Sequence, residues 1–201
     1  MLKELVFSKN VVEFTAVANE YCHFLENVSS NEKAEFIDKS IKLLSLMYYK
    51  ALSLPNAELV NEEPNETFVT EFDWHFIRNG IQSLLDEDDI YFEMYDENLQ
   101  ELSEPESNTI SEAMADIYQN VKDYLEIYKL GNEELSNDAI VNITETFNEY
   151  WGFELVKSLK TLHILRKHTS DNLSEQPKNK PLSDKKNWFI SQAQDEYRDR
   201  E

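Results

Sequence analysis

Apolar side chains recur every three or four residues along most of this chain, which is the spacing of one face of an α-helix. The clearest stripes run through residues 110–128 and 140–162, with polar positions between the apolar ones. Gly131 lies between the two stripes, and glycine readily adopts the left-handed conformation that ends a helix. The pattern therefore predicts two long helices joined by a short turn and packed as an antiparallel hairpin.

The first helix of this pair also carries a start signal. The hydroxyl of Thr109 or Ser111 can accept a hydrogen bond from the first free backbone amides of the helix. Its carboxylates, including Glu112, Asp116 and Asp123, fall largely between the apolar positions. We therefore expect these three side chains to face water.

The second helix of the pair carries an additional apolar stripe in its C-terminal half, formed by Phe153, Val156 and Ile164. A helix that is apolar on two sides is usually buried among other elements. This pattern predicts a central position for the helix in a bundle.

The same periodicity predicts three more helices in the N-terminal half, at residues 11–28, 29–54 and 70–85. Residues 86–108 are compatible with a short strand, but we favour an irregular packed segment. Residues 169–182 contain two prolines and are predicted to be a linker, followed by a short helix at 183–200 that Trp188 and Phe189 would anchor. The inward side chains of the helix at 70–85 are expected to be Trp74, Ile77, Ile81 and Leu84.

Together these elements predict an all-α fold, a single-domain helical bundle of about five to six helices with a central antiparallel hairpin and a short C-terminal helix. The predicted domain organisation is a helical bundle at residues 1–168, followed by a linker and a short amphipathic helix at 169–201.

Three segments carry a resemblance to a known family. They are residues 110–128, residues 147–163 and, less strongly, residues 12–26, and the most distinctive piece is the YWG triplet at 150–152 followed by Leu159 and His163. Over residues 8–166 the chain resembles the bacterial family DUF5063, a domain of unknown function. The resemblance implies an all-α protein of the bacterial cytoplasm. It implies no activity, because the family is uncharacterised.

Charge narrows the choice of partners. The net charge is −21, and residues 56–116 contain eighteen acidic residues and one basic residue, Arg78. Binding to nucleic-acid phosphates relies on Lys and Arg, so direct binding to nucleic acid or to an anionic membrane is disfavoured. A basic protein is the partner that this charge favours, although an acidic surface also serves solubility alone. The candidate contact residues are Asp86, Glu87, Asp88, Asp89 and Glu93.

Candidate catalytic chemistry is sparse. A di-iron site in a bundle needs two Glu-x-x-His motifs, and we find one, at Glu20 and His23. We therefore predict no metal, no cofactor and no catalytic residues, and Cys22 is expected to be a buried apolar group. Candidates for lining an internal pocket are His23, Trp151 and His163.

Three functions remain open on this basis. The first is a non-enzymatic acidic helical adaptor that binds a basic protein, such as a nucleic-acid-processing one. The second is a small-molecule- or metal-binding enzyme with a pocket in the bundle, and the third is a structural homo-oligomer. The apolar runs are too short to span a membrane and the N-terminus lacks a signal peptide, so a cytoplasmic location is expected. The sequence leaves open the identity of the partner and the oligomeric state.

Overall fold

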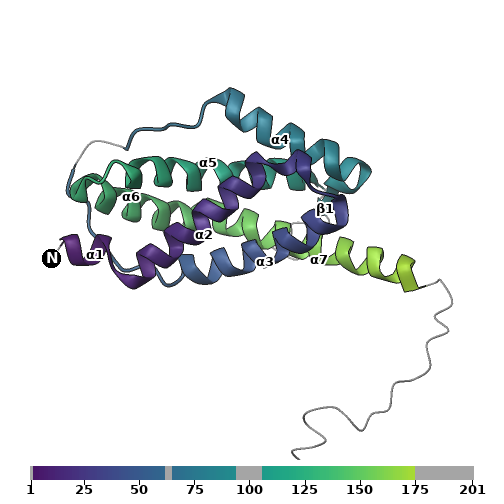
Figure 1. Ribbon diagram of the computed structural model, residues 1–201, viewed down its shortest axis with the longest axis horizontal. Coiled ribbons are helices and arrows are strands. Elements are labelled where there is room, and N and C mark those ends of the chain that lie inside the picture. The colour runs from purple at the N-terminus through teal and green to yellow at the C-terminus, as the bar shows by residue number, and fades with distance from the viewer. Residues whose placement is uncertain (1, 62–64, 94–105, 175–201) are drawn as a thin grey trace, which may run out of the picture. The chain divides into compact units, whose positions relative to one another are not determined.

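The computed structural model describes residues 2–61, 65–93 and 106–174 of the chain. These residues form a mainly α-helical fold (Figure 1), which confirms the predicted fold class at its broadest level. The predicted C-terminal helix at 183–200 lies outside the described residues. The elements in chain order are α1 (Leu2–Val6), α2 (Lys9–Glu26), η1 (Val28–Ser30), α3 (Lys33–Ala51), α4 (Glu71–Leu85), η2 (Asp86–Asp89), β1 (Ile90–Glu93), β2 (Glu106–Thr109), α5 (Ile110–Lys129), α6 (Glu133–Thr146), the π-helical segment η3 (Phe147–Trp151) and α7 (Gly152–Ser174).

Helix α4 begins at a reciprocal cap. The backbone N–H of Asp73 donates to Thr70 Oγ1 at 3.2 Å, and the backbone N–H of Thr70 donates to Asp73 Oδ2 at 3.0 Å. The Thr70 hydroxyl and the Asp73 carboxylate thus accept hydrogen bonds from two backbone N–H groups that have no partner within the helix. The two residues of this cap lie three positions apart in the sequence, and the predicted helix at 70–85 is confirmed.

Helix α5 makes contacts on several sides. Its N-terminal cap is Thr109, whose side chain accepts a hydrogen bond from the backbone N–H of Glu112, and the chain turns at Gly131 with φ of 69°. Both end signals were predicted. Between its ends, α5 packs against α2, α4 and α6 (Figure 1).

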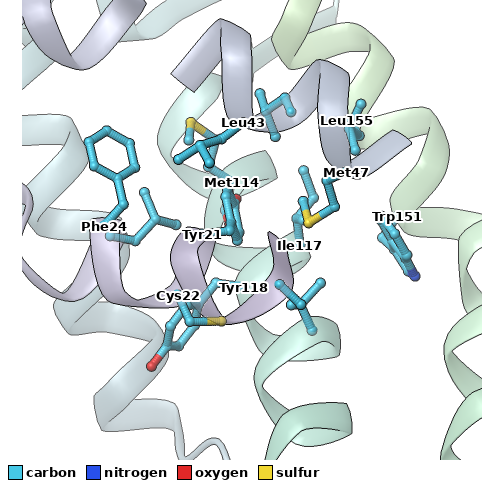
Figure 2. Packing of buried hydrophobic residues seen from close by; sticks show 14 of the residues in the cluster. Tyr21, Cys22, Phe24, Leu43, Met47, Met114, Ile117, Tyr118, Trp151 and Leu155 are labelled. Carbon is cyan, nitrogen blue, oxygen red and sulfur yellow. The ribbon is translucent and has the colours of Figure 1, made fainter. Parts of the chain in front are cut away.

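The hydrophobic core lies among α2, α3, α4, α5 and the helix formed by α6, η3 and α7, and Figure 2 shows part of it. Tyr21 is fully buried, and its hydroxyl donates to the backbone oxygen of Met114 at 2.9 Å. Beside it Cys22 is buried as predicted, and burial raises the pKa of its thiol well above the ordinary value. A protonated, enclosed thiol is a poor nucleophile.

No helix within the described ranges is long and apolar enough to cross a membrane.

The predicted second long helix is continuous but contains the π-helical segment η3. Here the indole of Trp151 is fully buried and its Nε1 donates to the backbone oxygen of Ile143 at 3.2 Å. The ring of Phe147 packs edge-on against this indole, with centroids 4.7 Å apart. The wider turn leaves no room for a side chain at Gly152, where an added Cβ would lie 2.4 Å from the backbone oxygen of Phe147.

Replacement of Gly152 by alanine is therefore expected to destabilise the protein, by about 1–3 kcal/mol, because a backbone atom must move. Elsewhere in a helix the same change usually increases stability by up to about 1 kcal/mol. Urea unfolding of the variant and of the parent measures whether the free energy of unfolding falls or rises. Glu149→Ala, an exposed position in the same turn, is the matched control. A Gly152→Ala variant more stable than the parent would contradict the described geometry.

The structure of residues 86–93 differs from our prediction of an irregular packed segment. The tetrapeptide Asp86–Asp89 forms η2, and Ile90–Glu93 then pairs antiparallel with Glu106–Thr109, so that Ile90 lies opposite Thr109. The prediction of an irregular segment was wrong because the partner strand of β1 begins only at Glu106. The local sequence pattern around β1 does not indicate that this distant segment pairs with it.

The second apolar stripe of α7 is not buried. The exposed fractions of Phe153, Val156 and Ile164 are 61%, 48% and 45%. The expectation that α7 is enclosed on two sides is therefore wrong. Helix α7 also continues to Ser174, into the predicted linker, because no glycine or proline interrupts residues 169–174.

Candidate binding groove along helix α4

The structure places the three predicted pocket residues in different environments. His23 is exposed on α2, where Asn27 Nδ2 donates to its backbone oxygen at 2.8 Å. His163 is exposed on α7, whereas Trp151 is fully buried. These side chains are therefore not gathered around one cavity. Among the described residues, no group of three or more His, Cys, Asp or Glu could hold a metal ion.

The predicted acidic contact run contains a buried member. Asp89 is 1% exposed, and its Oδ1 accepts a hydrogen bond from the backbone N–H of Ser111 at 2.8 Å. Its Oδ2 accepts a second one from Ser111 Oγ at 2.6 Å. Asp89 thus satisfies a free amide in the first turn of α5. A buried carboxylate cannot meet a partner, so Asp89 does not belong to the predicted contact surface.

Residues 86–88 of that run lie at the surface. Asp86 and Glu87 are exposed, and Asp88 Oδ2 lies 2.6 Å from Lys33 Nζ. Glu93 is the last residue of β1. The local surface is therefore less negative than the sequence suggests, because one carboxylate is buried and another is paired.

Carboxylates of α5 that were expected to face water make tertiary contacts instead. Trp74 Nε1 donates to Asp116 Oδ1 at 2.8 Å, and the hydroxyl of Tyr150 donates to Asp116 Oδ2. One turn earlier, Glu112 Oε1 lies 3.2 Å from Arg78 Nη2. These contacts attach α4 and η3 to α5, and they fix the position of the outer face of α4.

Two aspartates hold the long segment between α3 and α4 against the helices. Asp123 Oδ1 accepts hydrogen bonds from the backbone N–H groups of Phe68 and Val69 at 2.7 and 2.8 Å. Asp138 accepts from the consecutive backbone N–H groups of residues 60–61 at 2.8 and 3.0 Å. We call these two sets of hydrogen bonds the aspartate clamps. The clamp formed by Asp123 places Phe68 beside the start of α4, so the carboxylate of Asp123 makes tertiary contacts instead of only facing water.

A hollow of about 400 Å³ lies where α2, α4 and α5 meet the segment that Asp123 holds. Its walls combine phenyl and aliphatic groups with charged ones. The lining residues are Glu26, Phe68, Val69, Asp73, Phe76, Ile77, Tyr118, Lys122 and Glu126.

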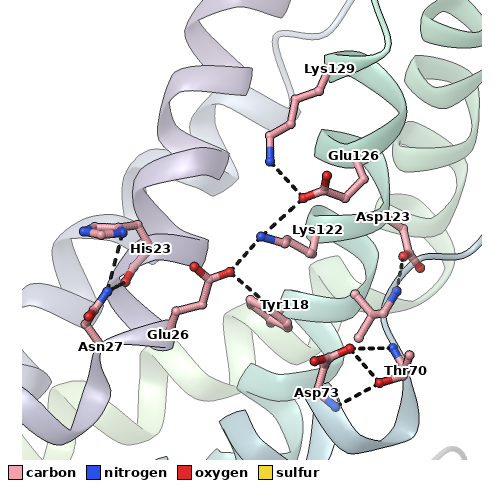
Figure 3. Close-up of polar contacts among 11 residues, drawn as sticks. His23, Glu26, Asn27, Thr70, Asp73, Tyr118, Lys122, Asp123, Glu126 and Lys129 are labelled. Carbon is pink, nitrogen blue, oxygen red and sulfur yellow. Dashed lines mark hydrogen bonds and ion pairs between the residues drawn. The ribbon is translucent and has the colours of Figure 1, made fainter.

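The charged wall of this hollow is a chain of ion pairs between α2 and α5 (Figure 3). Lys122 Nζ lies 2.8 Å from Glu26 Oε1 and 3.3 Å from Glu126 Oε1, while Lys129 Nζ lies 2.8 Å from Glu126 Oε1. The hydroxyl of Tyr118 donates to Glu26 Oε1 at 3.0 Å. Hydrogen bonding to Lys129, aided by Lys122, holds the pKa of Glu126 below its ordinary value. The carboxylate of Glu126 is therefore ionised at neutral pH.

A second, more apolar hollow of about 750 Å³ continues along the outer face of α4. It shares Phe76 with the first hollow, and Phe72 also lines it. These two rings are 56% and 78% exposed. At its floor, an added Cβ on Gly80 would lie 2.6 Å from Val28 Cγ1, so the glycine permits η1 to approach α4 closely. We call these two neighbouring hollows, which share Phe76 as a lining residue, the α4 groove.

The fold and this groove define a mainly α-helical protein with a hollow, partly charged surface along one helix. The chain belongs to the family described as "Domain of unknown function (DUF5063)", whose model matches residues 5–168. This confirms the family resemblance found in the sequence.

Among solved structures, the chain is similar to protein BF1032 from Bacteroides fragilis, for which a crystal structure exists. The two chains are 35% identical with a TM-score of 0.70, and the match covers 88% of this chain and 99% of that one. No curated protein matches the chain.

Proposed function

We propose that this protein is a non-enzymatic binding module, an adaptor that engages a basic protein through the α4 groove. The observation that carries the proposal is the exposure of Phe72 and Phe76, at 78% and 56%, where they line two neighbouring hollows. Large apolar side chains gathered on one surface commonly mark an interaction site. The groove replaces the acidic run at residues 86–89 as the principal contact surface.

Charge supports a basic partner. Among the described residues that line the first hollow, three carry carboxylates, Glu26, Asp73 and Glu126, and one, Lys122, carries an ammonium group. Hydrogen bonding to Thr70 lowers the pKa of Asp73 as well, so this side of the groove is negative at neutral pH. Nucleic-acid phosphates would be repelled. A partner with apolar side chains and nearby Lys or Arg residues complements both features, with the charges increasing the association rate.

Shape supports a helical segment as the part of the partner that binds. Helix α4 has 15 residues, which at 1.5 Å per residue gives a groove wall of about 22 Å. This length matches an amphipathic helix of about four turns, which binds grooves through apolar side chains at helical spacing.

The finer architecture belongs to the same proposal. We propose that residues 1–168 act as a single-domain bundle with the α5–α6 antiparallel hairpin at its centre. The packing of α5 against α2, α4 and α6 supports a central position for this helix. We also propose that the adaptor works in the bacterial cytoplasm.

The test is affinity capture of the tagged full-length protein in lysate of its native host, at low and at high salt, read by mass spectrometry. We expect one basic protein, retained at low salt and depleted at high salt, because salt screens exposed charges. Capture of no specific protein at either salt, or of acidic proteins alone, would contradict the adaptor.

A further inference from the structure

A third cavity, separate from the α4 groove, lies between α5 and α6 beneath residues 65–67. Its volume is about 250 Å³, just below the range of about 300–1,000 Å³ that is typical of small-molecule sites. The clamps formed by Asp123 and Asp138 hold the covering segment on either side of this cavity. Hydrogen bonds therefore hold the backbone at residues 60–61 and 68–69, which flank the described residues that cover the cavity.

The wall of this cavity carries carboxamides that have no hydrogen-bond partner within the described part of the chain. They belong to Asn65, Gln119 and Asn142. The neighbouring Asn120 differs, because its Nδ2 donates to the backbone oxygen of Asp116 at 2.9 Å. Each free carboxamide offers two N–H donors and one carbonyl acceptor. Three such groups around one small cavity are a recognition surface for a molecule with both donors and acceptors.

The remaining lining limits the charge and shape of that molecule. Aliphatic side chains, including Ile127 and Ile143, contribute an apolar surface. Among the described residues of the lining, the charged groups are the carboxylates of Glu66 and Asp123, and none is a Lys or Arg. Such a site repels phosphates and carboxylates and favours a neutral ligand with an apolar face.

We propose that this cavity binds a small neutral heterocycle of the nucleobase class. The edge of a nucleobase presents adjacent donors and acceptors, which Asn and Gln side chains pair with in bidentate fashion. Its faces are apolar and match the aliphatic part of the lining. A free base fits the small volume, whereas a nucleotide would bring its phosphate to the two carboxylates. This site is independent of the adaptor function.

The test is titration of the purified full-length protein with adenine, cytosine and uracil separately, followed by ligand-observed NMR and calorimetry. We expect at least one base to bind, and adenosine monophosphate to bind more weakly than adenine. Gln119→Met and Asn142→Leu keep the side-chain size but remove the carboxamide, and each is expected to weaken binding about tenfold. Asn10→Leu, an exposed position on α2, is the matched control.

Two results would overturn the proposal. One is the absence of binding by all three bases at millimolar concentration. The other is binding that is equally strong in the Gln119→Met, Asn142→Leu and Asn10→Leu variants. Thermal unfolding of each variant establishes that a loss of binding is not a loss of fold. Because the α4 groove is intact in these variants, their capture of a basic protein should equal that of the parent.

Discussion

Alanine at both Phe72 and Phe76 is expected to weaken binding of the captured basic protein by at least about 100-fold, because burial of one Phe side chain contributes about 1.5–3 kcal/mol. The two rings are mostly exposed in the free protein, so their removal should leave the free energy of unfolding nearly unchanged. Calorimetry with the purified partner measures the affinity, and urea unfolding measures the stability.

Phe153→Ala provides the matched control for this double variant. Phe153 is 61% exposed, so the control removes a comparable ring from α7 instead of α4. Equal loss of binding in the control and the double variant would mean that general surface hydrophobicity, and not the α4 groove, holds the partner. Unchanged binding in the double variant would show that the partner does not bind in the α4 groove.

Removal of the carboxylate of Asp138 is expected to have the largest effect on stability outside the apolar core. Asp138 is 2% exposed, and four hydrogen bonds reach it, from the backbone N–H and side-chain Nδ2 of Asn61, the backbone N–H of Val60 and Nδ2 of Asn137. Alanine would leave these donors without an acceptor. We expect Asp138→Ala to cost about 3 kcal/mol, measured by urea unfolding, and Asp138→Asn about 1 kcal/mol, because one acceptor is kept.

The contribution of Asp138 should also depend on pH. Burial alone would raise the pKa of this carboxyl, but the donors of Val60, Asn61 and Asn137 outweigh burial and hold the pKa below its ordinary value. A lowered pKa means that the stabilisation is complete above the ordinary Asp pKa of about 3.9 and is lost as the pH falls through the folded-state value. The difference between parent and Asp138→Asn should therefore shrink below about pH 4. A difference that stays constant down to acid unfolding would show that the charge is not involved.

The ends of α4 and α5 could be predicted because the groups that define them are neighbours in the sequence. Thr70 and Asp73 cap each other, and Thr109 caps the next helix within three residues. The sequence also contains a local indication of the candidate groove. The predicted inward stripe of Trp74, Ile77 and Ile81 places Phe72 and Phe76 outside it, and two phenyl rings on the outer face of a helix are unusual for a solvated surface.

The roles of the aspartates could not be predicted in the same way. Val69 lies 54 residues from Asp123, and Val60 lies 78 residues from Asp138. At the level of the sequence, an Asp on a helix resembles any solvated carboxylate, and its distant backbone donors become visible only when the chain is folded. The pairing of β1 with β2 escaped prediction for the same reason. Within the acidic stretch at residues 56–116, Asp89 and Asp116 likewise make contacts within the fold that their neighbours in the sequence do not reveal.

The π-helical segment Phe147–Trp151 has a consequence for how the chain tolerates insertions and deletions. A turn with one extra residue shifts the register of everything that follows, by about 100° of rotation about the helix axis. Loss of a single residue here would restore an ordinary turn, yet it would turn α7 as a whole and bring a different row of its side chains against the core. Length changes at this position therefore act on an entire helix, and we expect this stretch to keep its length wherever α7 keeps its orientation.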